Sequence, residues 1–329
     1  MSASTTTSSP ARVSRPSLSG HMNEIGLIAI VAMLYVVFGA ISPGFLSANN
    51  QVNILRDGAT IGIAAWAQTL VIVAGEIDIS VGPMVAFISV IMAFLLKWHL
   101  PLPVALAGGL VLGSALGGFA GLLRAVFTVP SFVATLGLWS ALRGLALFMT
   151  NALPISFGDN DTLDWIGGNL FGLPVSAIVM FVLFGAFVFA SRKTAFGRSV
   201  YAVGGNANAA HLCGINVTRI RIMVFAVSGL MAAITAIMLL ARLGTGNAGA
   251  ASGLEFDVIA AVVVGGTSLS GGRGSMLGTL LGVLTITVIS DGLVLYGINS
   301  FVQDVVRGVI IVAAVLLNVA AARRSGRLG

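Results

Sequence analysis

Two short acidic motifs interrupt otherwise apolar stretches of this sequence and are its best candidates for chemistry. Residues 75–80 read Gly-Glu-Ile-Asp-Ile-Ser, and residues 253–257 read Gly-Leu-Glu-Phe-Asp. Carboxylates between hydrophobic runs are costly unless they are paired, cap a broken helix or line water. Asp78 can accept hydrogen bonds at the start of the next helix or contact a transported solute, and the sequence leaves both roles open.

Other charged residues within apolar runs are few. Arg143 stands alone in its run, whereas Asp304 and Arg307 have the i,i+3 spacing that lets two side chains neutralise each other on one helix face. The sequence has no Cys/His cluster at metal-binding spacing, and its single cysteine, Cys213, excludes an internal disulfide. No arrangement of nucleophile, base or metal ligands indicates an enzyme.

The glycine-rich stretch 265–274, GGTSLSGGRG, resembles a phosphate-binding loop in composition only. It lacks the lysine of such loops and lies between apolar runs. We interpret it as a tight turn between two membrane spans. The chain alone is therefore not expected to bind or hydrolyse a nucleotide.

The composition indicates that a membrane protein positions these residues. Hydrophobic residues make up 57% of the 329-residue chain and charged residues only 9%, whereas a soluble protein carries about 25% charged residues. Too little charge remains to cover a water-facing surface, which excludes a soluble enzyme and a disordered protein. The net charge of +6 fits cytoplasmic loops rich in Lys and Arg better than a nucleic-acid partner, which we do not expect.

Ten apolar runs predict an all-α, polytopic transmembrane bundle of about ten spans. We expect the third and the eighth span to be short or broken, and the fifth to continue past Arg143. The runs cover residues 25–41, 58–75, 79–96, 100–123, 125–142, 170–191, 222–241, 258–272, 274–290 and 301–322.

Basic residues predict which side of the membrane each loop faces. With the N-terminus inside, twelve Lys and Arg residues fall on the cytoplasmic side, and only Arg56, Lys97 and Arg242 fall outside. This excess places both termini in the cytoplasm. The chain then consists of a disordered cytoplasmic tail, a transmembrane domain, a long cytoplasmic loop within it and a cytoplasmic C-terminal tail, at residues 1–24, 25–322, 192–221 and 323–329.

Two further patterns concern how the spans pack. In each acidic motif Glu-x-Asp follows a glycine, and the motifs stand five spans apart, which suggests an inverted repeat of spans two to five and seven to ten. Glycines recur every fourth residue in 109–121 and 274–282, forming smooth ridges that another helix can approach closely. Such ridges provide either fixed packing or sliding surfaces.

The cytoplasmic segment 197–215 predicts a short helix that is stopped at both ends. A Gly-Gly-Asn break precedes residues 207–213, which can form two helical turns, and a glycine ends them. A helix this short has no core of its own, so we expect it to dock on a partner. The residues expected to form it are Asn206 as the N-terminal cap, the small residues Ala207, Ala209 and Ala210, which allow close docking, and Gly214.

Four motifs, in order along the chain, make it resemble the permease subunits of ABC importers for monosaccharides of the ribose/arabinose/galactose type. The resemblance covers about residues 49–322. It is carried by GEIDISVG at 75–82, VPSFVATLG at 129–137, GR and YAVGGN within 197–206, and VGGTSLSGGRG at 264–274.

The resemblance implies the make-up of a whole transporter in the bacterial cytoplasmic (inner) membrane. This multi-pass chain would form a homodimer, joined by a separate cytoplasmic ABC ATPase and by a periplasmic or lipid-anchored sugar-binding protein. ATP and Mg²⁺ would bind to the ATPase, and this chain would hold no cofactor. Residues 206–214 would be the coupling helix that rests in a groove of the ATPase.

Two positions depart from the family pattern. Family members often carry an acidic residue in the coupling segment, where this chain has Asn208, and a second glycine where Glu76 stands. We therefore expect specialised contacts with the ATPase and with the solute.

An uncharged sugar is expected to pass along the subunit interface, past polar and aromatic side chains. The candidates are Asp78, Ser131, Phe132, Thr135 and Trp139, with Asn299 and Gln303 at the external end of the last span. For the aromatic residues, a role in helix packing is as well supported as a role in the path.

The alternative function is an ion-coupled secondary transporter, for which Glu76, Asp78 and Glu255 are the only reasonable titratable groups. The sequence does not distinguish a pentose, a hexose or a polyol such as inositol.

Overall fold

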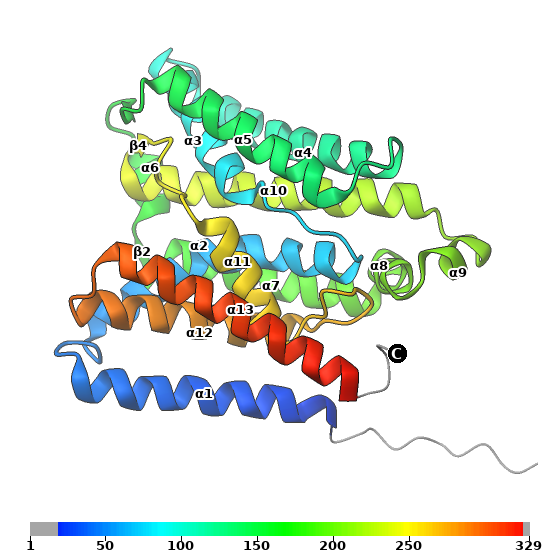
Figure 1. Cartoon of the computed structure of the whole chain (residues 1–329). Helices are drawn as coiled ribbons and strands as arrows, with labels where there is room; N and C mark the ends of the chain where they lie inside the picture. Colours follow the sequence, from blue (N-terminus) through cyan, green and yellow to red (C-terminus); the bar gives the residue numbers. More distant parts are fainter. Residues whose placement is uncertain (1–18, 325–329) are drawn as a thin grey trace, which may run out of the picture.

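The computed structural model describes residues 19–324, which form a bundle of long helices (Figure 1). Each of the ten apolar runs overlaps one of these helices, so the prediction of an all-α membrane protein is confirmed. They are α1 (Ser19–Ile41), α2 (Ala48–Val73), α3 (Val81–Lys97), α4 (Leu102–Ala125), α5 (Ser131–Thr150), α7 (Val175–Lys193), α10 (Val217–Leu243), α11 (Leu254–Val264), α12 (Met276–Leu295) and α13 (Ser300–Arg324).

Short elements lie in the connections. β1 pairs with β4 and β2 with β3, both antiparallel, and each strand has only two residues. These elements are β1 (Ile155–Ser156), α6 (Asp161–Gly167), β2 (Asn169–Leu170), β3 (Leu173–Pro174), α8 (Ala195–Gly205), α9 (Ala207–Leu212) and β4 (Thr245–Gly246).

Several predicted boundaries are wrong, each for a local reason. α1 begins at Ser19, inside the tail predicted at 1–24; residues 1–18 and 325–329 lie outside the described part of the chain. α5 begins at Ser131, directly after Pro130, because proline cannot continue a helix from its N-terminal side but suits a start. α11 begins four residues before the predicted run, and residues 265–275 are a non-helical turn, as the glycines predicted.

Among the described residues, six helices are long and apolar enough to cross a membrane: α1, α4, α5, α7, α10 and α12. α3 has 17 residues and α11 only 11, as expected for short or broken spans. α2 has 26 residues, but it contains Arg56, Asp57 and Gln68, which make it less apolar. The fold is therefore a helical membrane protein with several spans.

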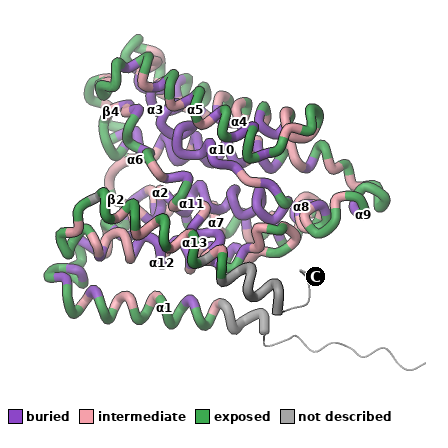
Figure 2. Tube along the Cα trace, viewed as in Figure 1, coloured by how far each residue is buried: buried purple, intermediate pink, exposed green. Residues whose placement is uncertain are grey.

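The core lies in the middle of the bundle, where α2, α3, α10 and α11 are the most buried helices (Figure 2). The outer helices instead expose large apolar side chains, such as Val36, Phe148 and Val182. Exposed apolar surface on this scale is incompatible with water and suits contact with lipid tails.

The helix contacts follow a repeated pattern. α3 contacts α4 and α5, and α11 contacts α12 and α13. α10 packs on α3 and α4, whereas α2 packs on α11 and α12. α2 and α10 also touch each other, so each of them joins one set of helices to the other.

The glycine ridge of α4 provides close packing. A Cβ added at Gly117 would collide with the backbone of α10 at Phe225, and a Cβ added at Gly229 of α10 would collide with the backbone of α4. No side chain can separate the two helices at this crossing, so their backbones are in direct contact. We call this closely packed pair of helices the α4/α10 body.

Candidate coupling segment and buried polar sites

The predicted docking segment consists of two short helices at one end of the bundle, α8 and α9 (Figure 1). Thr194 Oγ1 accepts a hydrogen bond from the Gly197 N–H (3.1 Å) at the start of α8. Asn206 Oδ1 accepts one from the Ala209 N–H (3.0 Å) and caps α9, as predicted. Gly214 follows α9 with a φ of +84°, a conformation that favours glycine and turns the chain away.

The details of the break differ from prediction. The two glycines at 204–205 are the last residues of α8 and not a break, because the chain becomes extended only at Asn206, with a φ of −162°. α9 has six residues, slightly fewer than the two turns that were expected.

Of the three alanines predicted to enter a groove of the partner, only Ala209 is exposed on α9. The side chain of Ala210 is only 5% exposed because it packs into this chain's own core. Ala207 is half-buried and Ala209 is exposed. Leu212 is 87% exposed, so the apolar group available to a partner is this leucine.

On its inner side, α8 is fixed to the end of α2 and to the 265–275 turn. The Gly272 N–H donates to the Val73 carbonyl (2.8 Å), and Gly204 packs on that same carbonyl, with no room for a side chain. The Tyr201 hydroxyl donates to the Gly274 carbonyl (2.9 Å). Burial raises the pKa of Tyr201 although the nearby Arg192 lowers it, so the phenol stays protonated and remains a donor.

The first acidic motif forms the non-helical linker between α2 and α3. Glu76 is buried, with its side chain 2% exposed, and it meets two arginines. Arg124 Nε, at the end of α4, lies 2.9 and 2.8 Å from the two carboxylate oxygens. Arg221 Nε, in the first turns of α10, lies 2.7 Å from Oε1 as an ion pair without the angle of a hydrogen bond.

Asp78, two residues further, has neutral hydrogen-bond partners. Oδ1 accepts from the Ser80 N–H (2.9 Å) and the Ser80 hydroxyl (2.6 Å), just before α3 begins. Oδ2 accepts from the hydroxyl of Ser228 in α10 (2.8 Å). Asp78 is 1% exposed, and its bonds fix the linker at Ser80 and to α10. Ser80, the N-cap of α3, makes no side-chain capping hydrogen bond, so capping of α3 by Asp78 is not observed.

Two residues predicted to line the path form hydrogen bonds with this linker. Ser131 Oγ accepts from the Ile77 N–H (3.2 Å), and Thr135 Oγ1 accepts from the Ile79 N–H (3.3 Å). An unpaired N–H within a membrane protein is costly, and the hydroxyls of α5 satisfy these two. Both side chains are buried.

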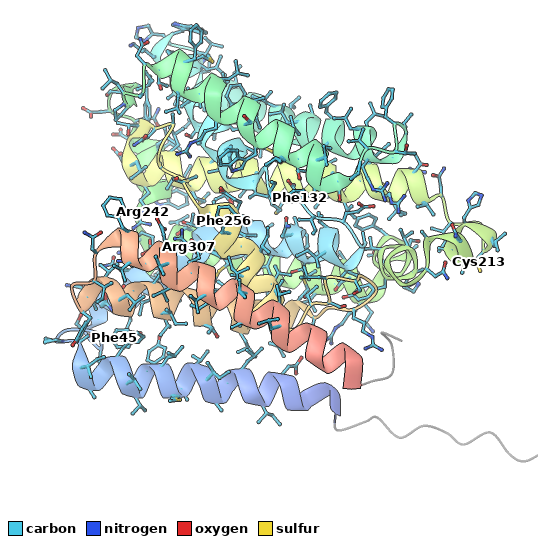
Figure 3. All side chains as sticks on the ribbon, in the orientation of Figure 1. Phe45, Phe132, Cys213, Arg242, Phe256 and Arg307 are labelled. Atoms are coloured by element: carbon cyan, nitrogen blue, oxygen red, sulfur yellow. The ribbon has the colours of Figure 1, made fainter. Side chains whose placement is uncertain are left out.

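The second acidic motif forms the start of α11. Trp139 Nε1–H donates to Glu255 Oε1 (2.8 Å), whereas Oε2 has no hydrogen-bond partner among the described residues. That oxygen packs against Gly82, where an added Cβ would collide with it. Asp257 forms an ion pair with Arg307 (2.5 Å), which also contacts Asp304 (2.8 Å) on its own helix, α13. In Figure 3, Phe256 and Arg307 lie close together on α11 and α13.

The remaining path candidates do not join these groups. Phe132 is 50% exposed on α5. At the start of α13, Asn299 Oδ1 accepts from the Phe301 N–H (2.9 Å), and Gln303 donates to the Ile298 carbonyl (2.9 Å). The structure thus brings Asp78, Ser131 and Thr135 together and leaves Asn299 and Gln303 apart.

Sequence reasoning missed some partners in these clusters. Ser228 gave no signal, because a serine in an apolar run is common. The pairing of Trp139 with Glu255 was also missed, although both residues had been singled out separately. Contacts between residues this distant in sequence become visible only when the helices are placed.

Comparisons with known proteins identify the family of this chain. A family model described as "Branched-chain amino acid transport system / permease component" matches residues 50–315. The probable ABC transporter permease protein YphD of Escherichia coli (strain K12) is 68% identical over 310 residues, which cover 94% of this chain and 93% of that protein. No solved structure matches significantly.

Two further relatives have sugars in their names. The ribose import permease protein RbsC of Escherichia coli (strain K12) is 38% identical, over 90% of this chain and 94% of that protein. The L-arabinose ABC transporter permease protein AraH of Azospirillum brasilense is 36% identical, over 90% of this chain and 88% of that protein.

The fold and its relatives define a membrane transport component, not an enzyme. The chain belongs to the permease family of ABC importers, in the sugar branch of the ribose, arabinose and xylose type, which rules out the ion-coupled secondary transporter.

Proposed function

We propose that this chain is the membrane unit of an importer for one monosaccharide or a related polyol, working as a homodimer in the bacterial inner membrane. An ATPase on the cytoplasmic side and a sugar-binding protein on the outer side complete the transporter. The observation that carries this proposal is the near full-length similarity to ribose and arabinose permeases.

A screen of the cognate binding protein tests the choice of sugar. D-ribose, L-arabinose, D-xylose, D-galactose and myo-inositol are added singly, and the thermal midpoint of the binding protein is measured. We expect one of them to raise the midpoint, because a ligand that binds only the folded state stabilises it. If none of the five changes the midpoint, the proposed substrate class is wrong.

We further propose ten spans with both termini in the cytoplasm. The start of α1 and the end of α13 lie at the same end of the bundle as α8 and α9 (Figure 1), which supports this orientation. A cysteine at Asp161, introduced with Cys213 replaced by serine, should react with an impermeant thiol reagent in intact cells. A cysteine at Ser199 should not react, and its labelling would contradict the topology.

The contact pattern supports the inverted repeat of α2 to α5 and α10 to α13. In the first set, α4 and α5 both pack on α3, the long helix that follows α2. In the second set, α12 and α13 both pack on α11, the helix that follows α10. The first helix of each half packs on the other half. Gly75 and Gly253 also have nearly the same φ, +80° and +82°, in the two acidic motifs.

We propose that α8 and α9, around residues 206–214, form the piece that docks on the ATPase. Leu212 would supply the apolar contact, while Asn206 and Gly214 set the ends of α9. The variant L212E should lose its ATPase during purification, because a carboxylate would enter an apolar contact. Leu153 is 66% exposed in the loop that follows α5, so L153E is the matched control. Retention of the ATPase by L212E would refute the docking proposal.

For the path of the sugar we propose the α5 side of the molecule. Phe132 supplies the exposed ring, Trp139 is held by Glu255, and Asp78, Ser131 and Thr135 shape the linker behind them. Asn299 and Gln303 would lie at its external end. The variant F132A should reduce uptake of the sugar identified in the screen, whereas V133A, at the neighbouring residue with 54% exposure, should not. Equal uptake by the two variants would remove Phe132 from the path.

A further inference from the structure

The carboxylate of Glu76 joins three separate elements at the end of the bundle that carries α8 and α9. It belongs to the linker after α2, Arg124 belongs to the end of α4, and Arg221 belongs to the start of α10. The arginine side chains are 24% and 21% exposed, whereas that of Glu76 is 2% exposed. One buried negative charge thus holds two partly exposed positive charges side by side.

The two arginines lie on the two helices of the α4/α10 body. α4 and α10 are in direct backbone contact where Gly117 and Gly229 leave no room for side chains. A force applied through Glu76 therefore acts on both helices together.

The linker has its other attachment on the side of α8. The Val73 carbonyl accepts from Gly272 (2.8 Å) and packs on Gly204, and Gly271 lies against Gly75. Gly75 has a φ of +80°, a conformation that a side chain disfavours. The chain turns at this glycine, and Glu76 is the next residue. The path from α8 to the α4/α10 body thus passes through residues 73–76.

A second ion pair joins α2 to α10 at their opposite ends. Asp57 lies 2.5 Å from Arg242, and their side chains are 47% and 34% exposed. Figure 3 shows Arg242 at one end of the molecule and Cys213, beside α9, at the other. Exposed pairs contribute little because water screens them, so this pair is a natural control for Glu76.

We propose that Glu76 is a positioning residue for energy coupling, which transmits the displacement of α8 and α9 to the α4/α10 body through its ion pairs with Arg124 and Arg221. This inference rests on the proposed docking of α8 and α9 on the ATPase. Without the carboxylate, the two arginines repel each other, and the linker loses its polar contact with the body.

The test uses the complete transporter, with its ATPase and binding protein, and measures movement directly. In transporters that combine one labelled with one unlabelled copy of this chain, spin labels are placed at V104C on α4 and F301C on α13, both at exposed positions, with Cys213 replaced by serine in both copies. The distance between the labels is measured with and without ATP and Mg²⁺. We expect a nucleotide-dependent change in the otherwise unaltered protein and in D57N, and a change smaller by about fivefold or more in E76Q.

ATPase retention separates this inference from the docking proposal. E76Q should keep its ATPase, whereas L212E should lose it. An unreduced distance change in E76Q would overturn the inference, and so would loss of the ATPase from E76Q, since Glu76 would then support docking instead. If E76Q does not fold, E76M/R124L/R221L removes all three charges without leaving one unpaired. This variant must show the same reduced movement, and a normal distance change in it would also overturn the inference.

Discussion

The two acidic motifs have nearly the same sequence pattern but opposite electrostatic arrangements. In the linker before α3, the glutamate is ion-paired to two arginines and the aspartate receives hydrogen bonds from two serines. At the start of α11, the glutamate receives a hydrogen bond from a tryptophan and the aspartate is ion-paired to an arginine. A Glu-x-Asp pattern therefore specifies two carboxylates at the start of a short helix, and the neighbouring helices decide which of them is paired with a cation.

The two motifs also connect different helices. The first motif holds a linker against the α4/α10 body, whereas the second ties α11 to α5 and α13. Four substitutions test this contrast. The expected losses are in the free energy of unfolding of the purified protein, and the midpoints of thermal unfolding are expected to fall in the same order.

The largest effect is expected at the ion pair of the second motif. R307L leaves Asp257 without its cation. Because the Asp257 side chain is only 13% exposed, we expect the free energy of unfolding to fall by about 3 kcal/mol. The double variant D257L/R307L removes both charges and should recover most of this loss. A double variant as unstable as R307L would show that packing of the arginine stem, and not charge, is responsible.

A smaller effect is expected at the glutamate of the second motif. W139F removes the indole hydrogen bond to the buried carboxylate of Glu255, which we expect to lower the free energy of unfolding by about 2 kcal/mol. The double variant W139F/E255Q should be more stable than the sum of the two single losses predicts, because a neutral amide is cheaper to bury than a carboxylate. Strictly additive effects of the two substitutions would contradict a direct interaction.

The aspartate of the first motif should be less sensitive, because it has more than one donor. S228A removes one hydrogen bond from Asp78 and leaves those of Ser80 in place, for a loss of about 1 kcal/mol. S114A is the matched control, since the Ser114 hydroxyl bonds only the Leu110 carbonyl of its own helix. Equal midpoints for the two variants would mean that Asp78 does not depend on α10.

The smallest effect is expected at the edge of the second motif. Arg143 donates to Ser252 (3.1 Å) in an exposed hydrogen bond, and S252A should therefore change the stability by less than about 0.5 kcal/mol. A loss as large as that of S228A would indicate that the chain near Ser252 is buried in the working protein, for example by the second subunit.

The sequence alone determined the class of the protein and most of its elements. Low charge and ten apolar runs require lipid around the helices, and four ordered motifs indicated the family that the comparisons later gave. Asn206 and Gly214 marked the ends of α9 correctly, because caps depend on atoms only a few residues apart.

Only the tertiary structure decided the partners of the buried charges. Glu76 is 48 residues from Arg124, and Asp78 is 150 residues from Ser228, so no local rule connects them. Ser131 and Thr135, which the sequence offered for the sugar path, satisfy N–H groups of the linker, and Ala210 packs into the core of this chain. The physical reason is that an unpaired polar group is costly to bury in a membrane protein, and which partner is available depends on how distant helices pack.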